Sequence, residues 1–287
     1  MSRGFSASGK RFVFDVGRRW QLRSYTECMA TRTKMPPPQP SKKAGRGKSK
    51  AAKARELELV EEVCEWVCGW EFELAARASG SMRIAGVDEV GRGPLFGPVV
   101  AAAVILPEGA ELEGLNDSKK LTEEERELFN ARVREIALAY AVAEVDVRTI
   151  DRINILQASR LAMRIAVEAL GQQPDHLLID GNQKIDYCPP GAVCRQTTIV
   201  QGDARSLSIA AASVIAKVHR DRLLCELDAV FPGYGLARNK GYGTPEHREA
   251  LLRLGITEMH RRSFAPVAEL FEVEVEGIEI EVGLFEE

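Results

Sequence analysis

Four carboxylic acids stand where three apolar segments of the chain end. Asp88 and Glu89 close the first segment, Asp180 closes the second, and Asp203 follows the third. Ligand and catalytic groups in open α/β sheets gather beyond the carboxyl ends of the strands. Carboxylates crowded at such an edge repel one another, so they need cations between them. Hard divalent ions with oxygen ligands, Mg²⁺ or Mn²⁺, meet that need, and the pattern therefore predicts a metal site.

Ordinary structural roles remain open for each acid taken singly. Neighbours on a strand point to opposite faces, so Asp88 and Glu89 can share a metal only if their strand is ending, which two glycines shortly after them allow. Asp180 precedes a glycine, a common turn pair, and Asp203 could cap the next helix. The four histidines lie in unrelated contexts and no serine has a nucleophile-elbow setting, which argues against a nucleophilic triad.

Predicted strands and helices alternate along the part of the chain that carries these acids. Apolar runs predict five strands, within 84–88, 98–106, 140–145, 176–179 and 197–200. Helical periodicity predicts helices over 151–170 and 206–228, with two short helices within 245–254 and 265–271. Hairpin-sized connections come first and helix crossovers later, so we expect a mixed sheet in an α/β layered domain.

The two ends of the chain differ from this body in composition. Residues 1–55 hold 15 Lys and Arg against two acids, whereas the remainder holds 24 against 40. Such a basic segment cannot bury enough apolar surface to offset its ordering entropy, and it predicts a disordered arm. Its charge favours attraction to a polyanion, although a solvated tail without a partner has the same composition. Residues 56–80 predict an amphipathic helix, and 269–287 an acidic tail.

No apolar run approaches the length of a membrane-spanning helix, and no apolar segment follows the arginines near the N-terminus. The sequence therefore predicts a cytoplasmic protein without membrane contact, and we expect a monomer.

Long motifs then establish a family resemblance. Six blocks of the chain, in the same order, resemble the signature segments of ribonuclease HII, the type 2 ribonuclease H family. They are residues 84–104, 116–121, 180–181, 202–218, 240–244 and 260–264. Phe96 replaces the small residue expected before Gly97, a departure that we expect to leave the chemistry untouched. The resemblance covers about 82–268 and excludes the arm and the tail.

The resemblance implies a ribonuclease H-like fold over 82–268, with a mixed five-stranded sheet, flanking helices and C-terminal helices. It also implies that Asp88, Glu89, Asp180 and Asp203 hold two divalent metal ions. The enzyme would be an endonuclease that cleaves the RNA strand of RNA–DNA hybrids and single ribonucleotides embedded in duplex DNA. By the same resemblance it cuts on the 5′ side of the ribonucleotide and leaves 3′-hydroxyl and 5′-phosphate ends, which starts the removal of misincorporated ribonucleotides.

The resemblance also implies which residues bind the substrate. Gly91, Arg92 and Gly93 match the segment that reads the 2′-hydroxyl, the group that distinguishes RNA from DNA. Tyr242 matches a tyrosine that stacks on the sugar of the following nucleotide. A plain turn and a gap-filling ring are the structural alternatives. Two lysines, Lys119 and Lys217, could contact phosphates or could simply be solvated.

Two other function classes compete with this interpretation. A non-catalytic nucleic-acid-binding protein with a basic arm would bind without its carboxylates and would need no metal. An enzyme of related fold could instead be a DNA-directed nuclease or a sugar-phosphate kinase, but Gly-Arg-Gly-Pro is not the phosphate loop that a kinase needs. In the tail, Leu284-Phe285 weakly resembles the peptides by which bacterial repair enzymes bind the sliding clamp; packing on the body is the alternative.

Overall fold

The structure is a computed structural model that describes residues 10–13, 68–189 and 191–270. All of them belong to one compact unit, which comprises residues 1–14 and 67–287. A second unit, residues 15–66, lies outside the described residues, and so do the acidic tail from residue 271 onward and its Leu-Phe peptide. Most of the predicted arm and residues 56–67 of the predicted N-terminal helix are therefore not tested.

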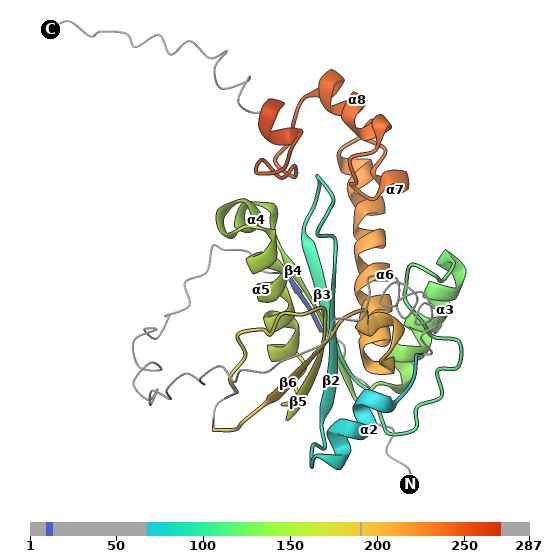
Figure 1. Ribbon diagram of the computed structural model, residues 1–287. Coiled ribbons are helices and arrows are strands. Elements are labelled where there is room, and N and C mark those ends of the chain that lie inside the picture. The colour runs from blue at the N-terminus through green and yellow to red at the C-terminus, as the bar shows by residue number, and fades with distance from the viewer. Residues whose placement is uncertain (1–9, 14–67, 190, 271–287) are drawn as a thin grey trace, which may run out of the picture. The chain divides into compact units, whose positions relative to one another are not determined.

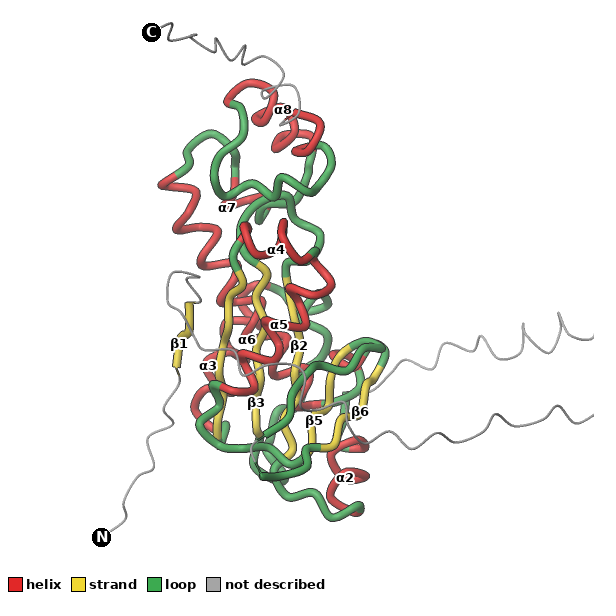
Figure 2. Tube along the Cα trace, turned by 90° about the vertical axis from the view of Figure 1, so that its left-hand side faces the viewer, coloured by secondary structure: helices red, strands yellow, loops and turns green. Residues whose placement is uncertain are grey.

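A single mixed sheet forms the centre of this unit (Figures 1 and 2). Its strands are β1 (Lys10–Val13), β2 (Ile84–Val90), β3 (Val99–Ile105), β4 (Ala139–Val145), β5 (His176–Asp180) and β6 (Arg195–Ile199). They lie in the order β1-β4-β3-β2-β5-β6. The β2–β3 and β3–β4 pairs are antiparallel, whereas β5 pairs in parallel with both β2 and β6. The mixed sheet and its five expected strands are thus confirmed.

Strand β1 is an addition that the sequence analysis did not predict. It pairs in parallel with β4, from Lys10 opposite Ala141 to Val13 opposite Glu144. The expectation of a disordered arm is therefore wrong for residues 10–13. The charge count over 55 residues concealed a short segment with strand-forming residues, and an open sheet edge offers such a segment unpaired backbone groups.

Helices cover both faces of the sheet. Helix α5 (Ile155–Glu168) packs on one face, and α6 (Leu207–Val230) packs on the other, with α3 (Glu123–Ile136) beside it (Figure 1). Every residue of β3 is buried because the two faces are both covered, which explains its unbroken apolar run. Helix α6 approaches β2 closely at Gly86, where an added Cβ would lie 2.1 Å from the backbone of Ser208. The start of α6 is therefore held directly against the strand that carries Asp88.

The helix expected over 151–170 is interrupted. Helix α4 (Val147–Ile153) ends and α5 begins at Asn154, which has a φ of 64°. The Asn154 side chain accepts a hydrogen bond from the Gln157 N–H at 3.1 Å. Asparagine tolerates this left-handed φ and caps the new helix, so a periodic apolar pattern can continue across a break.

A short non-helical segment lies within the predicted N-terminal helix. Helix α2 covers Glu71–Ala78, and residues 68–70 before it are not helical. Gly69 instead forms a parallel bridge with Ser206, and its carbonyl accepts from the Leu207 N–H at 3.1 Å. Glycine weakens a helix by about 1 kcal/mol relative to alanine. The bridge between Gly69 and Ser206 can therefore form in place of a helical turn at this position.

Helix α2 is tied to the start of α6 by a buried carboxylate. Glu73 is 2% exposed, and its Oε1 accepts from the Ser206 hydroxyl at 2.6 Å and the Ser208 N–H at 2.9 Å. A negative charge at a helix N-terminus satisfies free N–H groups and complements the helix dipole. This contact joins a segment outside the family resemblance to the helix that underlies the predicted site.

The C-terminal part is helical at the two predicted positions and has one further short helix, residues 236–239, that was not predicted. Helices α7 (Leu236–Asn239) and α8 (Pro245–Leu254) lie beyond the end of α6, and residues 267–270 are helical (Figure 1). They share a small apolar core with Phe96, which is fully buried and lies edge-on to the His260 ring at a centroid distance of 4.9 Å. The residue that departs from the family pattern therefore joins this part to the sheet. Among the described residues, no helix has the length and apolar character needed to cross a membrane.

Candidate active site

Three neighbouring strands bring the predicted carboxylates to one edge of the sheet. Asp88 and Glu89 lie near the end of β2, and Asp180 is the last residue of the adjacent parallel strand β5. Asp203 lies in the 3₁₀ turn Gly202–Ala204 (η1), which follows β6. The Asp180 Oδ1 accepts from the Gly202 N–H at 2.7 Å and so ties the end of β5 to the turn that carries Asp203.

Burial and mutual repulsion raise the pKa of three of these carboxyls. The pKa of Asp88 lies well above its usual range because of burial, then because of the charges of Glu89 and Asp180. Burial also raises the pKa of Glu89, although Arg92 opposes the shift. For Asp203 burial again comes first, followed by the charges of Asp117 and Asp180. The carboxylates thus act on one another electrostatically, as groups that share cations do.

The donor chemistry suits a hard divalent cation, because the converging groups are carboxylate oxygens. Among the residues that the structure describes, however, no three Asp, Glu, His or Cys side chains lie at the spacing of ligands around one ion. The strand pleat contributes to this spacing. Asp88 faces Ser213 of α6, whereas Val87, two residues before Glu89, packs with the core on the α5 side. Asp88 and Glu89 therefore lie on opposite faces of β2.

Sequence reasoning missed two residues of this site. Asp117 acts on the Asp203 carboxyl, and its Oδ1 accepts from the Lys119 N–H at 2.9 Å. Ser213 donates to Asp88 and lies 2.9 Å from the Ser118 hydroxyl, oxygen to oxygen. The signal for both was present in the family blocks 116–121 and 202–218, from which only Lys119, Asp203 and Lys217 were assigned roles.

The predicted substrate residues lie on two adjoining loops. Gly91, Arg92 and Gly93 follow β2, and a Cβ added to Gly93 would lie 3.5 Å from the Tyr242 ring. The Leu95 N–H donates to the Gly241 carbonyl at 2.8 Å, which joins the two loops. The Tyr242 side chain is 45% exposed, so part of it is accessible to a ligand.

The two predicted lysines differ in position. Lys119 lies at the carboxylates, with its Nζ 3.5 Å from Asp203 Oδ2 and 3.9 Å from Asp117 Oδ1. Lys217 instead pairs with Asp221, one turn along α6, at 2.7 Å. In the described part of the chain, no hydrogen bond or ion pair joins Lys217 to the four carboxylates.

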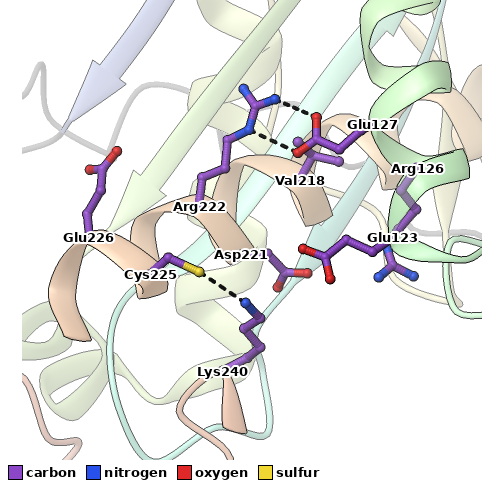
Figure 3. A pocket seen from close by; sticks show the side chains of 9 residues that line it. All are labelled: Glu123, Arg126, Glu127, Val218, Asp221, Arg222, Cys225, Glu226 and Lys240. Atoms are coloured by element: carbon purple, nitrogen blue, oxygen red, sulfur yellow. Dashed lines mark hydrogen bonds and ion pairs between the residues drawn. The ribbon is translucent and has the colours of Figure 1, made fainter. Parts of the chain in front are cut away.

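A groove of about 280 Å³ lies apart from the carboxylates, between α3 and α6 (Figure 3). Its lining residues are Glu123, Arg126, Glu127, Val218, Asp221, Arg222, Cys225, Glu226 and Lys240. Arg222 pairs with Glu127, and the Lys240 Nζ lies 3.2 Å from the Cys225 Sγ. The groove thus carries both signs of charge, which does not favour a purely anionic ligand.

Two buried histidines support the Tyr242 loop. His260 Nδ1 accepts from the Thr257 N–H at 2.9 Å, so its proton must lie on Nε2, which is 3.2 Å from Nε2 of His247. His247 Nδ1 then donates to the Tyr242 carbonyl at 2.9 Å. Both rings are fully buried and neutral in this chain of hydrogen bonds. Burial lowers the pKa of His247, and burial together with His247 lowers that of His260 to about 3.

This arrangement predicts an acid-sensitive stability. Between pH 6.5 and about 3 the unfolded chain binds a proton at His260 that the folded protein does not. The contribution of His260 to the free energy of unfolding should therefore be fully present above pH 6.5. Below that pH the free energy of unfolding should fall by about 1.4 kcal/mol per pH unit because of this residue. Urea unfolding from pH 7.5 to 4.5 measures the slope. His260→Gln should show a shallower slope, and an unchanged slope in that variant would contradict the prediction.

Comparisons with known proteins agree on one family. The family model for Ribonuclease HII matches residues 85–267. Ribonuclease HII of Koribacter versatilis is 52% identical over 221 residues, which cover 77% of this chain and 84% of that protein.

Solved structures show the same fold. The ribonuclease H2 of Pyrococcus horikoshii OT3 has a TM-score of 0.56 and 26% identity, over 67% of this chain and 98% of its own. RNase HII of Archaeoglobus fulgidus, solved in a complex with PCNA, has a TM-score of 0.52 and 27% identity, over 63% and 94%. The ribonuclease H-like fold expected from the motifs is thereby confirmed.

Proposed function

Because the chain belongs to the ribonuclease HII family, we propose that it cuts duplex nucleic acid on the 5′ side of a ribonucleotide and leaves 3′-hydroxyl and 5′-phosphate ends. Members of this family are metal-dependent endonucleases that cleave the RNA of RNA–DNA hybrids, and the chain is a ribonuclease of this class. We also propose that the chain cleaves at single ribonucleotides embedded in duplex DNA. One observation carries it: the carboxylate edge directly adjoins the loops of Gly93 and Tyr242.

The four carboxylates Asp88, Glu89, Asp180 and Asp203 would hold two divalent ions, Mg²⁺ or Mn²⁺. When bound, such ions supply an activated water and stabilise charge on the leaving 3′-oxygen. Two cationic side chains flank the carboxylates and would take phosphate oxygens: Arg92, 3.4 Å from Glu89, and Lys119, 3.5 Å from Asp203. These residues place the phosphodiester at the acidic edge, which would otherwise repel it.

Recognition of the ribonucleotide falls to the two loops. The backbone at Gly93 can approach the ribose closely because this residue has no side chain, and Gly91 has a φ of 89° that favours glycine. The ring of Tyr242 beside Gly93 would stack on the sugar of the next nucleotide. A flat ring there excludes a 2′-hydroxyl and so favours an RNA-to-DNA junction.

A cleavage assay tests the proposal. The substrate is duplex DNA with one ribonucleotide, run beside an all-DNA duplex and with EDTA. We expect one metal-dependent cut, 5′ of the ribonucleotide, with a 3′-hydroxyl that a polymerase can extend. Cutting of the all-DNA duplex would favour a DNA-directed nuclease, and binding without any cutting would favour the non-catalytic alternative.

The basic arm gives a separate prediction. Replacing Lys42, Lys43, Lys48 and Lys50 with Gln leaves β1 in place and removes four charges. If the arm contacts phosphates, the plot of log affinity against log salt should flatten by about 0.9 per lost contact, with turnover at saturation unchanged. Fluorescence anisotropy over a salt series measures the slope. Equal slopes for the variant and the unaltered protein would show that the arm does not bind nucleic acid.

A relative suggests a partner for the acidic tail. RNase HII of Archaeoglobus fulgidus, which is similar to this chain, was solved in a complex with PCNA. We include in the proposal that Leu284 and Phe285 bind a sliding clamp. A pull-down with purified clamp should retain the full chain and lose a Leu284→Ala, Phe285→Ala variant. Equal retention of both proteins, or of neither, would exclude this role.

A further inference from the structure

Two buried arginines lie beneath the substrate loops and have no part in the site described so far. Arg220 of α6 is 1% exposed, and Arg261, from the segment after α8, is 0% exposed. Within the described residues, neither arginine has a carboxylate at ion-pair distance. Hydrogen bonds to other groups therefore stabilise the two buried guanidinium groups. Burial lowers the pKa of Arg220 to about 10 and that of Arg261 to about 9, so both remain charged at neutral pH.

Arg261 binds the glycine-containing loop through three backbone carbonyls. Its Nη2 donates to the Gly91 carbonyl at 2.7 Å and its Nη1 to the Arg92 carbonyl at 3.0 Å. Its Nε donates to the Gly97 carbonyl at 2.9 Å. One planar guanidinium therefore holds both ends of the loop.

Arg220 joins the same loop to the loop of Tyr242. Its Nε and Nη2 donate to the carbonyls of Pro98 and Phe96, at 3.2 and 3.0 Å, and its Nη1 donates to the Lys240 carbonyl at 2.9 Å. The Arg220 side chain also packs against Gly91, where an added Cβ would lie 2.2 Å from Nε. A side chain at that position would displace the arginine.

These contacts fix the direction of the loop amides. In a trans peptide the carbonyl of one residue and the N–H of the next point to opposite sides. With the carbonyls of Gly91 and Arg92 turned toward Arg261, the N–H groups of Arg92 and Gly93 point away from the buried guanidinium. In the part of the chain described, neither N–H donates a hydrogen bond to another residue. Both are thus available to a ligand oxygen.

We propose that Arg220 and Arg261 are positioning residues that set the discrimination between ribose and deoxyribose. They hold the carbonyls of the loop inward, so that the amides of Arg92 and Gly93 meet the 2′-hydroxyl and Tyr242 meets the next sugar. The inference rests on the proposed function, in which this loop reads the 2′-hydroxyl. A buried ion without a counter-charge is costly, and apolar side chains could fill the same space. Apolar side chains could not, however, provide the six directed hydrogen bonds that the two arginines make.

Lysine substitutions test this role, because lysine keeps the charge but cannot reach three carbonyls in one plane. The variants are Arg220→Lys and Arg261→Lys. Arg222→Lys is the matched control, since Arg222 lies on the same helix, is exposed and pairs with Glu127. Dissociation constants are measured in EDTA for two duplexes that differ only by one 2′-hydroxyl. Circular dichroism and the melting temperature report on folding.

We expect the preference for the ribonucleotide duplex to fall about tenfold in the two test variants, as for loss of a hydrogen bond worth about 1.4 kcal/mol, and to persist in Arg222→Lys. A preference that persists in a folded test variant overturns the inference for that arginine. Loss of the native spectrum in both overturns it as well, because the arginines would then maintain the fold as a whole. If the unaltered protein itself shows no preference, the proposed reading of the 2′-hydroxyl fails first.

Discussion

Replacing Asp88 with Asn should reduce cleavage of a ribonucleotide-containing duplex by about a thousandfold or more, with little change in the dissociation constant. Asn is the same size as Asp but cannot carry the negative charge that a divalent cation requires at this buried position. A metal ion contributes several kcal/mol to charge stabilisation in the transition state, and about 4 kcal/mol corresponds to a thousandfold in rate. Asp180→Asn should act in the same way.

Single-turnover rates and binding in EDTA separate the two effects. Asp186→Asn is a suitable control because Asp186 is an exposed acid in the loop after β5, away from the carboxylate edge. Turnover by Asp88→Asn near the unaltered rate at ordinary Mg²⁺ concentration would exclude the proposed site. A loss that the Asp186 control shares would point instead to the overall negative charge of the body.

Tyr242→Ala should impair cutting at a single embedded ribonucleotide far more than cutting within a continuous RNA–DNA hybrid. The ring lies beside Gly93 and is about half exposed, so it can stack on the deoxyribose that follows the ribonucleotide. Aromatic stacking in nucleic-acid sites contributes about 1–3 kcal/mol, which corresponds to about 5- to 150-fold. Tyr242→Phe keeps the ring and should keep most of the activity on both substrates.

The ratio of kcat/KM for the two substrates is the measurement that matters. Equal losses on both would show that Tyr242 only shapes its loop, which the contact between its carbonyl and His247 would then explain. A loss in Tyr242→Phe as large as that in Tyr242→Ala would assign the effect to the hydroxyl group and not to stacking.

The sheet was readable from the sequence because both of its faces are buried. Strand β3 is an unbroken apolar run for that reason, and β2 and β5 end visibly where acids replace apolar residues. The carboxylates could be predicted from the same contrast, since an acid directly after a buried strand is conspicuous. The family blocks then supplied the loop residues, which carry no periodic signal.

The residues that escaped prediction depend on contacts between distant segments. Asp117 matters because it lies near Asp203, and Ser213 because it faces Asp88; nothing local marks either. Arg261 was interpreted only as part of a motif, and Arg220, two residues beyond another motif, was assigned no role, because a charged residue is normally expected at the surface. Their burial follows only once α6 and the segment after α8 are packed against the glycine-containing loop.

The carboxylate of Glu73 has a consequence for where the smallest independently folding fragment must begin. The recognisable family segment starts at residue 85, but the N-terminus of α6 is closed by a side chain that lies before it. A fragment trimmed to the homologous segment would expose the first turn of α6 and the apolar residues that α2 covers. The family model therefore marks the catalytic part of this molecule, whereas a fragment that keeps the start of α6 covered must also include α2, which lies before the matched segment.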